Sequence, residues 1–276
     1  MSTPPPVASG LGCITLKKMD NFIRKIKNYL VEKLLFFNFF QRIIGKRWFK
    51  RWENKYILAE KELSLLPIMM PSNPVIFDIG ANRGELGYFF ANICKADTVY
   101  SFEPQNRMFG VLLGVAENTK NIKPFNIAFS NSNGEKTLKI PIQSNHQYTQ
   151  AASLEETCVV DYKKEIVKIK TLDSFVNENK IDKLDFIKCD TEGHELLVFE
   201  GAKKTITSLR PLIYVEIKDT NLKKMFELFK ETNYKAYTYN NYTNKIVPFT
   251  EEPKTKSENY YFVPIEKEQQ FLASIR

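Results

Sequence analysis

The sequence predicts a doubly wound α/β sheet, mostly parallel, with an antiparallel last strand and an N-terminal helical extension. Three observations support this prediction. Short apolar runs rich in β-branched residues alternate with segments in which apolar residues recur at helical spacing. A glycine turn joins the first such run to the helix after it, and acidic residues follow several of the predicted strands. In a doubly wound sheet those positions lie at the edge where ligands bind.

The elements follow one another in a regular order. A helical pattern runs from about Asp20 to Trp52, where Gly45 is expected to break it, and a second short helix is expected to end at Pro67. Further helices are predicted from 85, at 108–118, at 172–177, from 195 to about 208, and at 222–231. Strands are predicted from 75, and at 98–102, 124–129, 135–140, 166–170, 184–189, 212–217, 234–239, 245–249 and 259–263. Because the last three strands lie close together in sequence, they predict antiparallel pairing at one end of the sheet.

The first strand leads into the most informative turn of the chain. The strand breaks at Asp78, and the turn reads Gly80-x-Asn82-x-Gly84. A dinucleotide site favours a second glycine at the position of Asn82, because a pyrophosphate needs the room. Asp78 would repel a phosphate but suits a cation, and S-adenosylmethionine carries an ammonium and a sulfonium centre. The turn favours that cofactor over a dinucleotide, and an ordinary glycine turn between a core strand and a helix is the alternative.

Positive charge is concentrated at the N-terminal end. The 276 residues carry a net charge of +8, and residues 1–55 hold twelve lysines and arginines against three acids. The rest of the chain is close to neutral. Since nucleic-acid enzymes usually spread positive charge around their site, no nucleic-acid partner is expected. Four scattered cysteines without C-x-x-C spacing argue against a zinc site or a disulfide framework, and fit a reducing compartment.

The basic N-terminal arm has two interpretations. It is either a helix packed on the catalytic body or on a partner, or an interfacial helix lying on anionic lipid. Its apolar stretch at 34–40 is far shorter than the roughly 20 residues of a transmembrane helix, and no secretory signal is readable. We therefore expect a cytoplasmic protein, with peripheral membrane contact under the second interpretation.

Acidic residues close four of the predicted strands. They are Asp78, Glu103, the pair Asp190 and Glu192, and Glu216. A carboxylate after the second strand can accept both ribose hydroxyls, which suits Glu103. Any one of these acids could instead be a helix N-cap, but four strand ends in register favour a ligand site.

A set of segments in fixed order resembles the FkbM family of S-adenosylmethionine-dependent methyltransferases. The resemblance covers about residues 74–263 and rests on Ile76-Phe-Asp-Ile-Gly-Ala-Asn-x-Gly84, Phe102-Glu-Pro104, Asn126-Ile-Ala128, Thr171-Leu-Asp173, Ile187-Lys-Cys-Asp-x-Glu-Gly-x-Glu195, Phe199-Glu-Gly-Ala202, Pro211 and Glu216. It implies a seven-stranded Rossmann-like methyltransferase sheet and methyl transfer to an oxygen, commonly of a sugar in a glycan, polysaccharide or glycolipid. On this basis we expect a disordered leader at 1–18, the basic aromatic arm at 19–70, a methyltransferase domain at 71–265 and a C-terminal tail at 266–276.

The resemblance also implies roles for individual residues. The methionine end of the cofactor would be held by Asp78, Gly80, Asn82 and Gly84. Glu103 would hold the ribose, and Asn126 with Ala128 would edge the adenine. Asp190 and Glu192 would face the acceptor.

Methyl transfer to a hydroxyl requires removal of its proton. Asp190 is the expected general base, with Glu192 or Glu216 as its partner, since two close carboxylates raise one pKa toward neutrality. Alternatively, Asp190 and Glu216 hold a divalent cation such as Mg²⁺ that acidifies the hydroxyl.

The long polar segment 143–161 is expected to cover the acceptor. Its candidate sugar contacts are His146, Tyr148 and Ser153, although any exposed loop has a similar composition. His194 either reaches the acceptor or is a surface residue at a helix N-terminus. Two other classes remain open at this stage, a nicotinamide-dependent Rossmann oxidoreductase and a non-catalytic module that binds S-adenosylmethionine.

Overall fold

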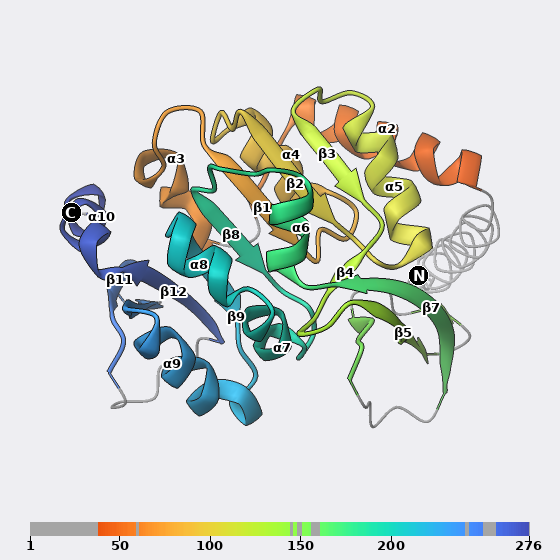
Figure 1. Ribbon diagram of the computed structural model, residues 1–276. Coiled ribbons are helices and arrows are strands. Elements are labelled where there is room, and N and C mark those ends of the chain that lie inside the picture. Colours follow the sequence, from red (N-terminus) through yellow and green to blue (C-terminus); the bar gives the residue numbers. More distant parts are fainter. Residues whose placement is uncertain are drawn as a thin grey trace, which may run out of the picture.

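The computed structural model describes residues 38–58, 61–143, 146–147, 151–155, 161–240, 243–250 and 258–275. Within these ranges the chain forms one large sheet, one small sheet and helices on both sides of the large sheet (Figure 1).

The large sheet has eight strands in the order β11-β10-β12-β9-β8-β1-β2-β3. Five of them are parallel: β1 Val75–Ile79, β2 Thr98–Phe102, β3 Ile122–Phe125, β8 Phe186–Cys189 and β9 Leu212–Glu216. The other three pair antiparallel: β10 Tyr234–Asn240, β11 Lys245–Pro248 and β12 Asn259–Pro264. The predicted mostly parallel sheet with an antiparallel last strand is confirmed. The sheet has eight strands rather than seven because β11 adds a further strand beside β10.

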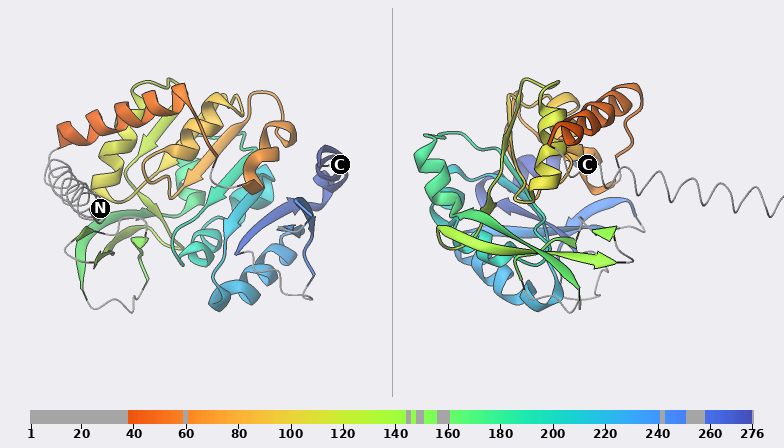
Figure 2. Two further views of the ribbon diagram at one scale, coloured as in Figure 1. Left: turned by 180° about the vertical axis from the view of Figure 1, so that it is seen from behind. Right: turned by 90° about the vertical axis from the view of Figure 1, so that its right-hand side faces the viewer.

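A small sheet lies beside the large one, on the side away from the C-terminus (Figures 1 and 2). Its order is β4-β7-β5-β6, with β4 Ala128–Phe129, β5 Gly134–Gln143, β6 His146–Gln147 and β7 Tyr162–Lys170. The strand predicted at 124–129 is therefore divided. Its first half, in β3, completes the large sheet, and its second half, in β4, pairs with β7.

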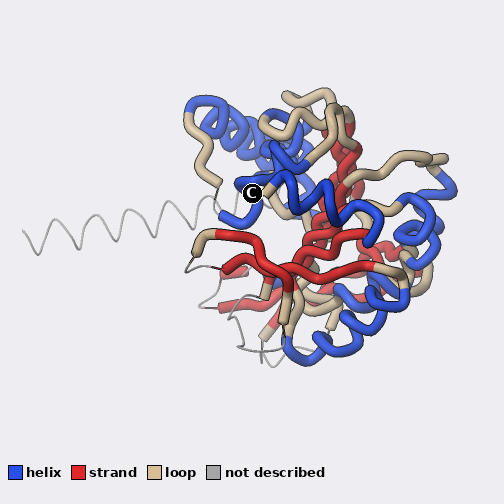
Figure 3. Tube along the Cα trace, turned by 90° about the vertical axis from the view of Figure 1, so that its left-hand side faces the viewer, coloured by secondary structure: helices blue, strands red, loops and turns tan. Residues whose placement is uncertain are grey.

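Helices cover both faces of the large sheet (Figure 3). On β1, Ile76 and Phe77 point to opposite faces, as successive strand residues must. Phe77 packs in an apolar cluster with residues of α6 and α9, whereas Ile76 packs with residues of α2 and α4. The helices are α2 Asn38–Asn54, η1 Lys61–Leu65, α3 Leu66–Met69, α4 Glu85–Asn92, α5 Asn106–Ala116, α6 Leu172–Glu178, α7 Glu195–Glu200, α8 Lys203–Leu209, η3 Asp219–Asn221, α9 Leu222–Glu231, η4 Ile265–Lys267 and α10 Glu268–Ser274.

Gly45 lies inside α2 and does not break it, so that prediction is wrong. A Cβ at Gly45 would lie 2.0 Å from the carbonyl oxygen of Val111 on α5, and one at Gly114 would lie 2.1 Å from the carbonyl oxygen of Arg42. The two helices therefore cross at a distance that only glycine permits. This tertiary contact outweighs the low helix propensity of glycine.

Two other predicted boundaries are wrong, one because of a close tertiary contact and one because of a local helix start. The helix expected from 195 to about 208 is two helices, α7 and α8, which meet at Gly201, where a Cβ would lie 2.2 Å from the carbonyl oxygen of Ser130. Pro67 does not end a helix. It occupies the first turn of α3, where its missing N–H costs no hydrogen bond. Residues 268–274, within the expected C-terminal tail, form α10.

The described part of the arm packs on the body. Trp52 of α2 is 5% exposed, and Arg42 and Lys46 pair with Glu117 at 3.3 and 2.7 Å. For residues 38–54 the arrangement matches the packed-helix interpretation, while the helical pattern at 20–37 lies outside the described residues. No helix in the described ranges is long and apolar enough to cross a membrane.

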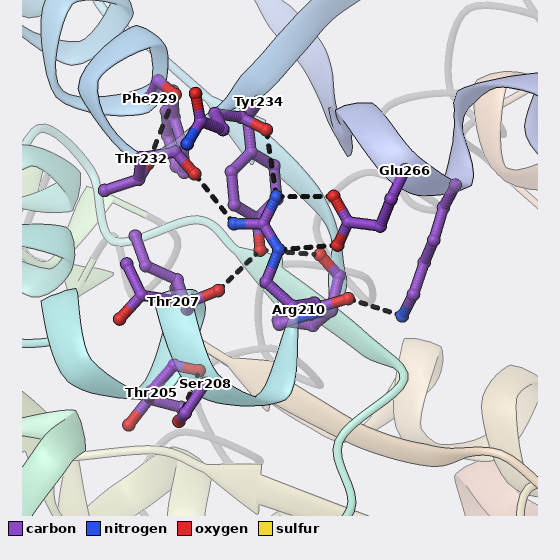
Figure 4. Close-up of polar contacts among 12 residues, drawn as sticks. Thr205, Thr207, Ser208, Arg210, Phe229, Thr232, Tyr234 and Glu266 are labelled. Carbon is purple, nitrogen blue, oxygen red and sulfur yellow. Dashed lines mark hydrogen bonds and ion pairs between the residues drawn. The ribbon is translucent and has the colours of Figure 1, made fainter.

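A single arginine ties three segments together at the antiparallel end of the sheet (Figure 4). Arg210 follows α8 in a left-handed conformation, with φ 51°. Its guanidinium contacts both carboxylate oxygens of Glu266 at 2.7 and 2.9 Å, donates to the carbonyls of Thr232 and Asn233, and lies over the ring of Tyr234. The hydrogen bonds from Arg210 lower the pKa of Glu266 to about 2. The network joins α8 to the α9–β10 connection and to η4.

The close crossing of α2 and α5 at Gly45 and Gly114 predicts how one added methyl group changes the stability of the protein. Gly114→Ala should lower the free energy of unfolding by about 1–3 kcal/mol, because the added Cβ overpacks the contact between α2 and α5. Alanine is the better helix former, so an uncrowded site would give the opposite sign. Urea unfolding followed by circular dichroism measures the change. The control Lys224→Ala, on an exposed face of α9, should change stability by no more than about 0.5 kcal/mol.

Candidate functional site

The carboxyl ends of β1, β2 and β8 open onto a cavity of about 610 Å³, a size typical of small-molecule sites. The segment 151–155 and Leu138 of the small sheet form part of its wall. Five carboxylates and two basic side chains line the described part of the cavity: Asp78, Glu85, Glu103, Asp190, Glu192, Arg83 and Lys188. The lining is therefore acidic and favours a cationic ligand.

The glycine turn after β1 brings two strand ends together. Gly80 has φ 76°, and a Cβ there would lie 1.8 Å from the carbonyl oxygen of Asp190. Gly84 has φ 84° and packs on Leu112 of α5, and Asn82, with φ 49°, adopts a left-handed conformation that asparagine tolerates. The glycines are thus required by backbone conformation and by the close approach of β8, in addition to any ligand contact.

Asp78 is a buried carboxylate on the wall of this cavity. Its side chain is fully buried, and its contacts among the described residues are weak: a backbone N–H from Gly87 and the ammonium of Lys188 at 3.9 Å. Burial raises the pKa of Asp78 to about 6, an effect that Lys188 opposes and Asp190 reinforces. Because a buried carboxylate with such weak contacts is costly, the position is suited to a ligand that carries a cation or donors.

Glu103, at the end of β2, helps to hold the turn. Its two oxygens accept hydrogen bonds from the backbone N–H groups of Asn82 and Gln105, each at 2.8 Å. Burial raises the pKa of Glu103 to about 7, against the lowering effect of these two bonds. Each oxygen keeps a lone pair for a further donor.

Asn126 holds the backbone at Glu103 and Pro104 through hydrogen bonds. Its side-chain amide donates to the carbonyls of Glu103 and Pro104, both at 2.9 Å. Asn126 does not line the cavity, whereas Ala128 does.

The end of β8 forms a tight turn that Glu195 organises. One oxygen of Glu195 accepts hydrogen bonds from the N–H groups of Thr191 and Gly193 and from the Thr191 hydroxyl. Glu192 has φ 57° and pairs with Lys218 at 3.1 Å. Burial raises the pKa of Glu192, and the hydrogen bond from Lys218 opposes that rise. Asp190 and Glu192 both line the cavity.

Lys188 lies between the end of β1 and the end of β8, and it was not predicted from the sequence. Its ammonium lies 3.5 Å from Asp190 and 3.9 Å from Asp78, and donates to the carbonyl of Gly80 at 3.0 Å. This buried cation compensates the two carboxylates. The sequence did contain one indication of this role, a lysine within an otherwise apolar strand, two positions before Asp190.

Glu216 ends β9, the strand next to β8, but does not line the cavity. Burial raises its pKa to about 7, and repulsion from Asp190 and Glu192 adds to the shift. The acids at the ends of β8 and β9 are thus electrostatically coupled. The described residues contain no group of three or more His, Cys, Asp or Glu placed to hold a metal.

The predicted acceptor segment borders the cavity through Ala151, Ala152 and Leu154. Ser153 pairs with Lys139 of β5 through the backbone, and its hydroxyl donates to the carbonyl of Glu192 at 2.8 Å. His146 belongs to β6, and Tyr148 lies outside the described residues.

His194 is a buried wall residue, so the interpretation as a surface histidine is wrong. It is 1% exposed and lines the cavity. One ring nitrogen contacts Glu155 and the other lies 2.9 Å from the hydroxyl of Ser130. Burial lowers the pKa of His194, an effect that Glu155 opposes. With both nitrogens engaged, His194 anchors the segment 151–155 to the turn after β8.

The described residues fit S-adenosylmethionine. The oxygens of Asp78 can accept an ammonium group, Glu103 can accept ribose hydroxyls, and the acidic lining suits a ligand of net positive charge. Little of the lining is suited to a pyrophosphate.

Comparison with known proteins decides the family. Residues 78–239 match the methyltransferase FkbM domain. The chain belongs to this family. The predicted enzyme class, an S-adenosylmethionine-dependent methyltransferase, is therefore confirmed, and the nicotinamide alternative is not supported.

Two curated relatives are methyltransferases. The chain is 28% identical over 174 residues to the 2-O-methyltransferase NoeI of Sinorhizobium fredii, a match that covers 57% of this chain and 69% of that protein. It is 27% identical over 172 residues to the hexuronic acid methyltransferase AglP of Haloferax volcanii, covering 60% of this chain and 65% of that one. A crystal structure of methyltransferase FkbM from Methylobacillus flagellatus is 18% identical, with a TM-score of 0.45, and covers 69% of this chain and 43% of that one.

The raised pKa of Asp78 predicts how cofactor binding depends on pH. Because the pKa is about 6, protonation below pH 6 removes the negative charge that favours a cationic ligand. The dissociation constant of S-adenosylmethionine should then rise about tenfold per pH unit below that value, measured by calorimetry from pH 5 to 8.

The Asp78→Asn variant shows which carboxyl group causes this pH dependence, because Glu103 titrates in a similar pH range. The variant should bind S-adenosylmethionine more weakly at pH 7, and its dissociation constant should no longer rise below pH 6. The surface control Asp97→Asn should keep the parent curve. If the dissociation constant of Asp78→Asn still rises below pH 6, the titration belongs to another residue.

Proposed function

We propose that this protein transfers a methyl group from S-adenosylmethionine to a hydroxyl of a sugar, in a glycan, polysaccharide or glycolipid. The observation that carries the proposal is the juxtaposition of Asp190 with the turn that follows Asp78, through the contact at Gly80. The relatives support a sugar acceptor, since one is named for 2-O-methylation and the other for a hexuronic acid.

The donor side of the cavity is assigned to the turn after β1 and to Glu103. Asp78 would bind the ammonium of the methionine end, beside the backbone of Gly80, Asn82 and Gly84. Glu103 would accept the ribose hydroxyls while it holds the turn through Asn82. Ala128 would contact the adenine directly, and Asn126 would act by fixing the backbone of Glu103 and Pro104.

The acceptor side is assigned to the turn after β8. When bound, the cofactor supplies an electrophilic methyl group. Asp190 would accept the proton of the attacking hydroxyl, and Lys188, 3.5 Å away, would keep Asp190 oriented and balance its charge. Glu192 would accept a further hydroxyl of the sugar, and Glu216, which does not line the cavity, would act on Asp190 and Glu192 only through the repulsion between their charges.

An acidic cavity favours a hydroxyl over a carboxylate as the acceptor. A carboxylate acceptor would be repelled by Asp190 and Glu192 and would need no base. Ser153 and His194 support the wall next to the acceptor side, and direct sugar contacts from His146 and Tyr148 stay predictions. Peripheral membrane contact also stays a prediction, and it now depends on the basic segment before residue 38.

Asp190→Asn tests the role of the base. The variant should still bind S-adenosylmethionine but lose about 10²–10⁴ in kcat, the usual contribution of general base catalysis. Transfer of a labelled methyl group to neutral sugars, hexuronic acids and glycans of the source cells measures the rate. The exposed control Asp182→Asn should keep the parent rate. Full turnover by Asp190→Asn would remove Asp190 from catalysis and would favour a carboxylate acceptor.

Metal dependence separates the two roles proposed for the acids. The ammonium of Lys188, 3.5 Å from Asp190, opposes the approach of a second cation. Treatment with EDTA should therefore change the rate of methyl transfer by less than about twofold. Loss of a catalytic Lewis acid, which typically contributes several kcal/mol, would lower the rate far more. A loss of activity that Mg²⁺ restores would instead assign Asp190 and Glu216 to a cation.

A further inference from the structure

We propose that the N-terminal helix α2 is part of the cofactor site, where Trp48 holds Arg83 at the cavity wall and Arg83 binds the carboxylate of the methionine end. This inference rests on the proposed function in taking S-adenosylmethionine as the ligand. It gives a role to the basic aromatic arm, which lies outside the residues that match the family.

Arg83 belongs to the glycine turn and lines the cavity. Its guanidinium carbon lies 4.5 Å from the centre of the Trp48 ring, in a cation–π contact. Its Nε and Nη2 atoms both donate to the same oxygen of Glu85, at 3.2 and 2.6 Å. The Nη1 edge therefore has no partner among the described residues and can donate to a ligand.

Trp48 is itself held firmly by the body. It contacts Trp52 on its own helix and packs against Met108 and Val111 of α5. The helix that carries it is fixed to α5 by the glycine crossing described above. Farther along the arm, Tyr56 stacks on Tyr88 of α4 and also lines the cavity. The arm thus supplies one wall residue directly and orients a second.

Charge distribution in the cavity selects Arg83 as the carboxylate ligand. Of the two basic side chains on the described wall, Lys188 already lies between Asp78 and Asp190 and donates to a backbone carbonyl. Arg83 is the other; it pairs with a single carboxylate, that of Glu85, and its side chain is 35% exposed. The methionine end of the cofactor carries an ammonium beside a carboxylate. Asp78, at the end of β1, suits the first, and a guanidinium from the turn that follows suits the second.

The cofactor analogue that lacks only this carboxylate, decarboxylated S-adenosylmethionine, provides the test. Calorimetry on the full chain measures both ligands. Arg83→Met should weaken the binding of S-adenosylmethionine by about tenfold or more, the usual value of a charge-assisted hydrogen bond. The same variant should change the affinity for the analogue by less than about twofold. Trp48→Ala should reduce the preference for S-adenosylmethionine in the same direction, by about three- to tenfold.

Two variants keep the result interpretable. Arg47→Met removes a neighbouring exposed arginine of α2 and should leave both affinities unchanged. Trp48→Phe keeps a ring beneath Arg83 and should restore most of the preference, even if Trp48→Ala lowers the thermal stability. An equal loss of both ligands in Arg83→Met would overturn the proposal, because Arg83 would then only shape the turn. Unchanged binding of both would overturn it as well. If the parent chain binds neither ligand, the proposed function itself fails.

Discussion

The contact between Gly80 and the carbonyl of Asp190 is the constraint on which the site depends. Adjacent parallel strands bring their carboxyl ends to one edge, and Gly80 and Asp190 directly follow Ile79 and Cys189, the last paired residues of β1 and β8. Without a Cβ at Gly80 the two backbones can touch. The residues that we propose for the donor and acceptor sides therefore face a single cavity. In-line methyl transfer requires this arrangement, since donor and acceptor must lie within bonding distance.

Bringing carboxylates together at one edge has an electrostatic cost, which the fold offsets with a buried lysine. Lys188 is anchored by the carbonyl of Gly80, so its position does not depend on the ion pairs alone. It lies between Asp78 and Asp190 and opposes the rise in the pKa of Asp78 that burial causes. With both acids ionised, this group of three carries one net negative charge, which complements a cofactor of one net positive charge. Loss of the sulfonium charge on transfer would weaken that attraction and favour release of the product.

The same use of glycine connects the arm to the site. Gly45 and Gly114 allow α2 and α5 to touch, and this contact sets the position of Trp48 over Arg83. In the acceptor half, His194 and Glu195 act similarly through hydrogen bonds, His194 by fixing the segment 151–155 and Glu195 by shaping the turn after β8. The chemistry is thus assigned to a few carboxylates, and much of the surrounding sequence controls where they lie.

The sequence by itself determined the sheet class, the position of the glycine turn, and the acids at the ends of β1, β2, β8 and β9. These features follow from local patterns, namely the periods of strands and helices and the residue that ends each strand. The tertiary structure alone decided why Gly45 and Gly80 are glycine, that His194 is buried, and that Lys188 compensates two carboxylates. Lys188 and Gly80 are 108 residues apart, so their contact leaves no periodic signal. Only the packing of β8 against β1 places the lysine between the two acids, and only the crossing of α2 with α5 places the arm beside the cavity.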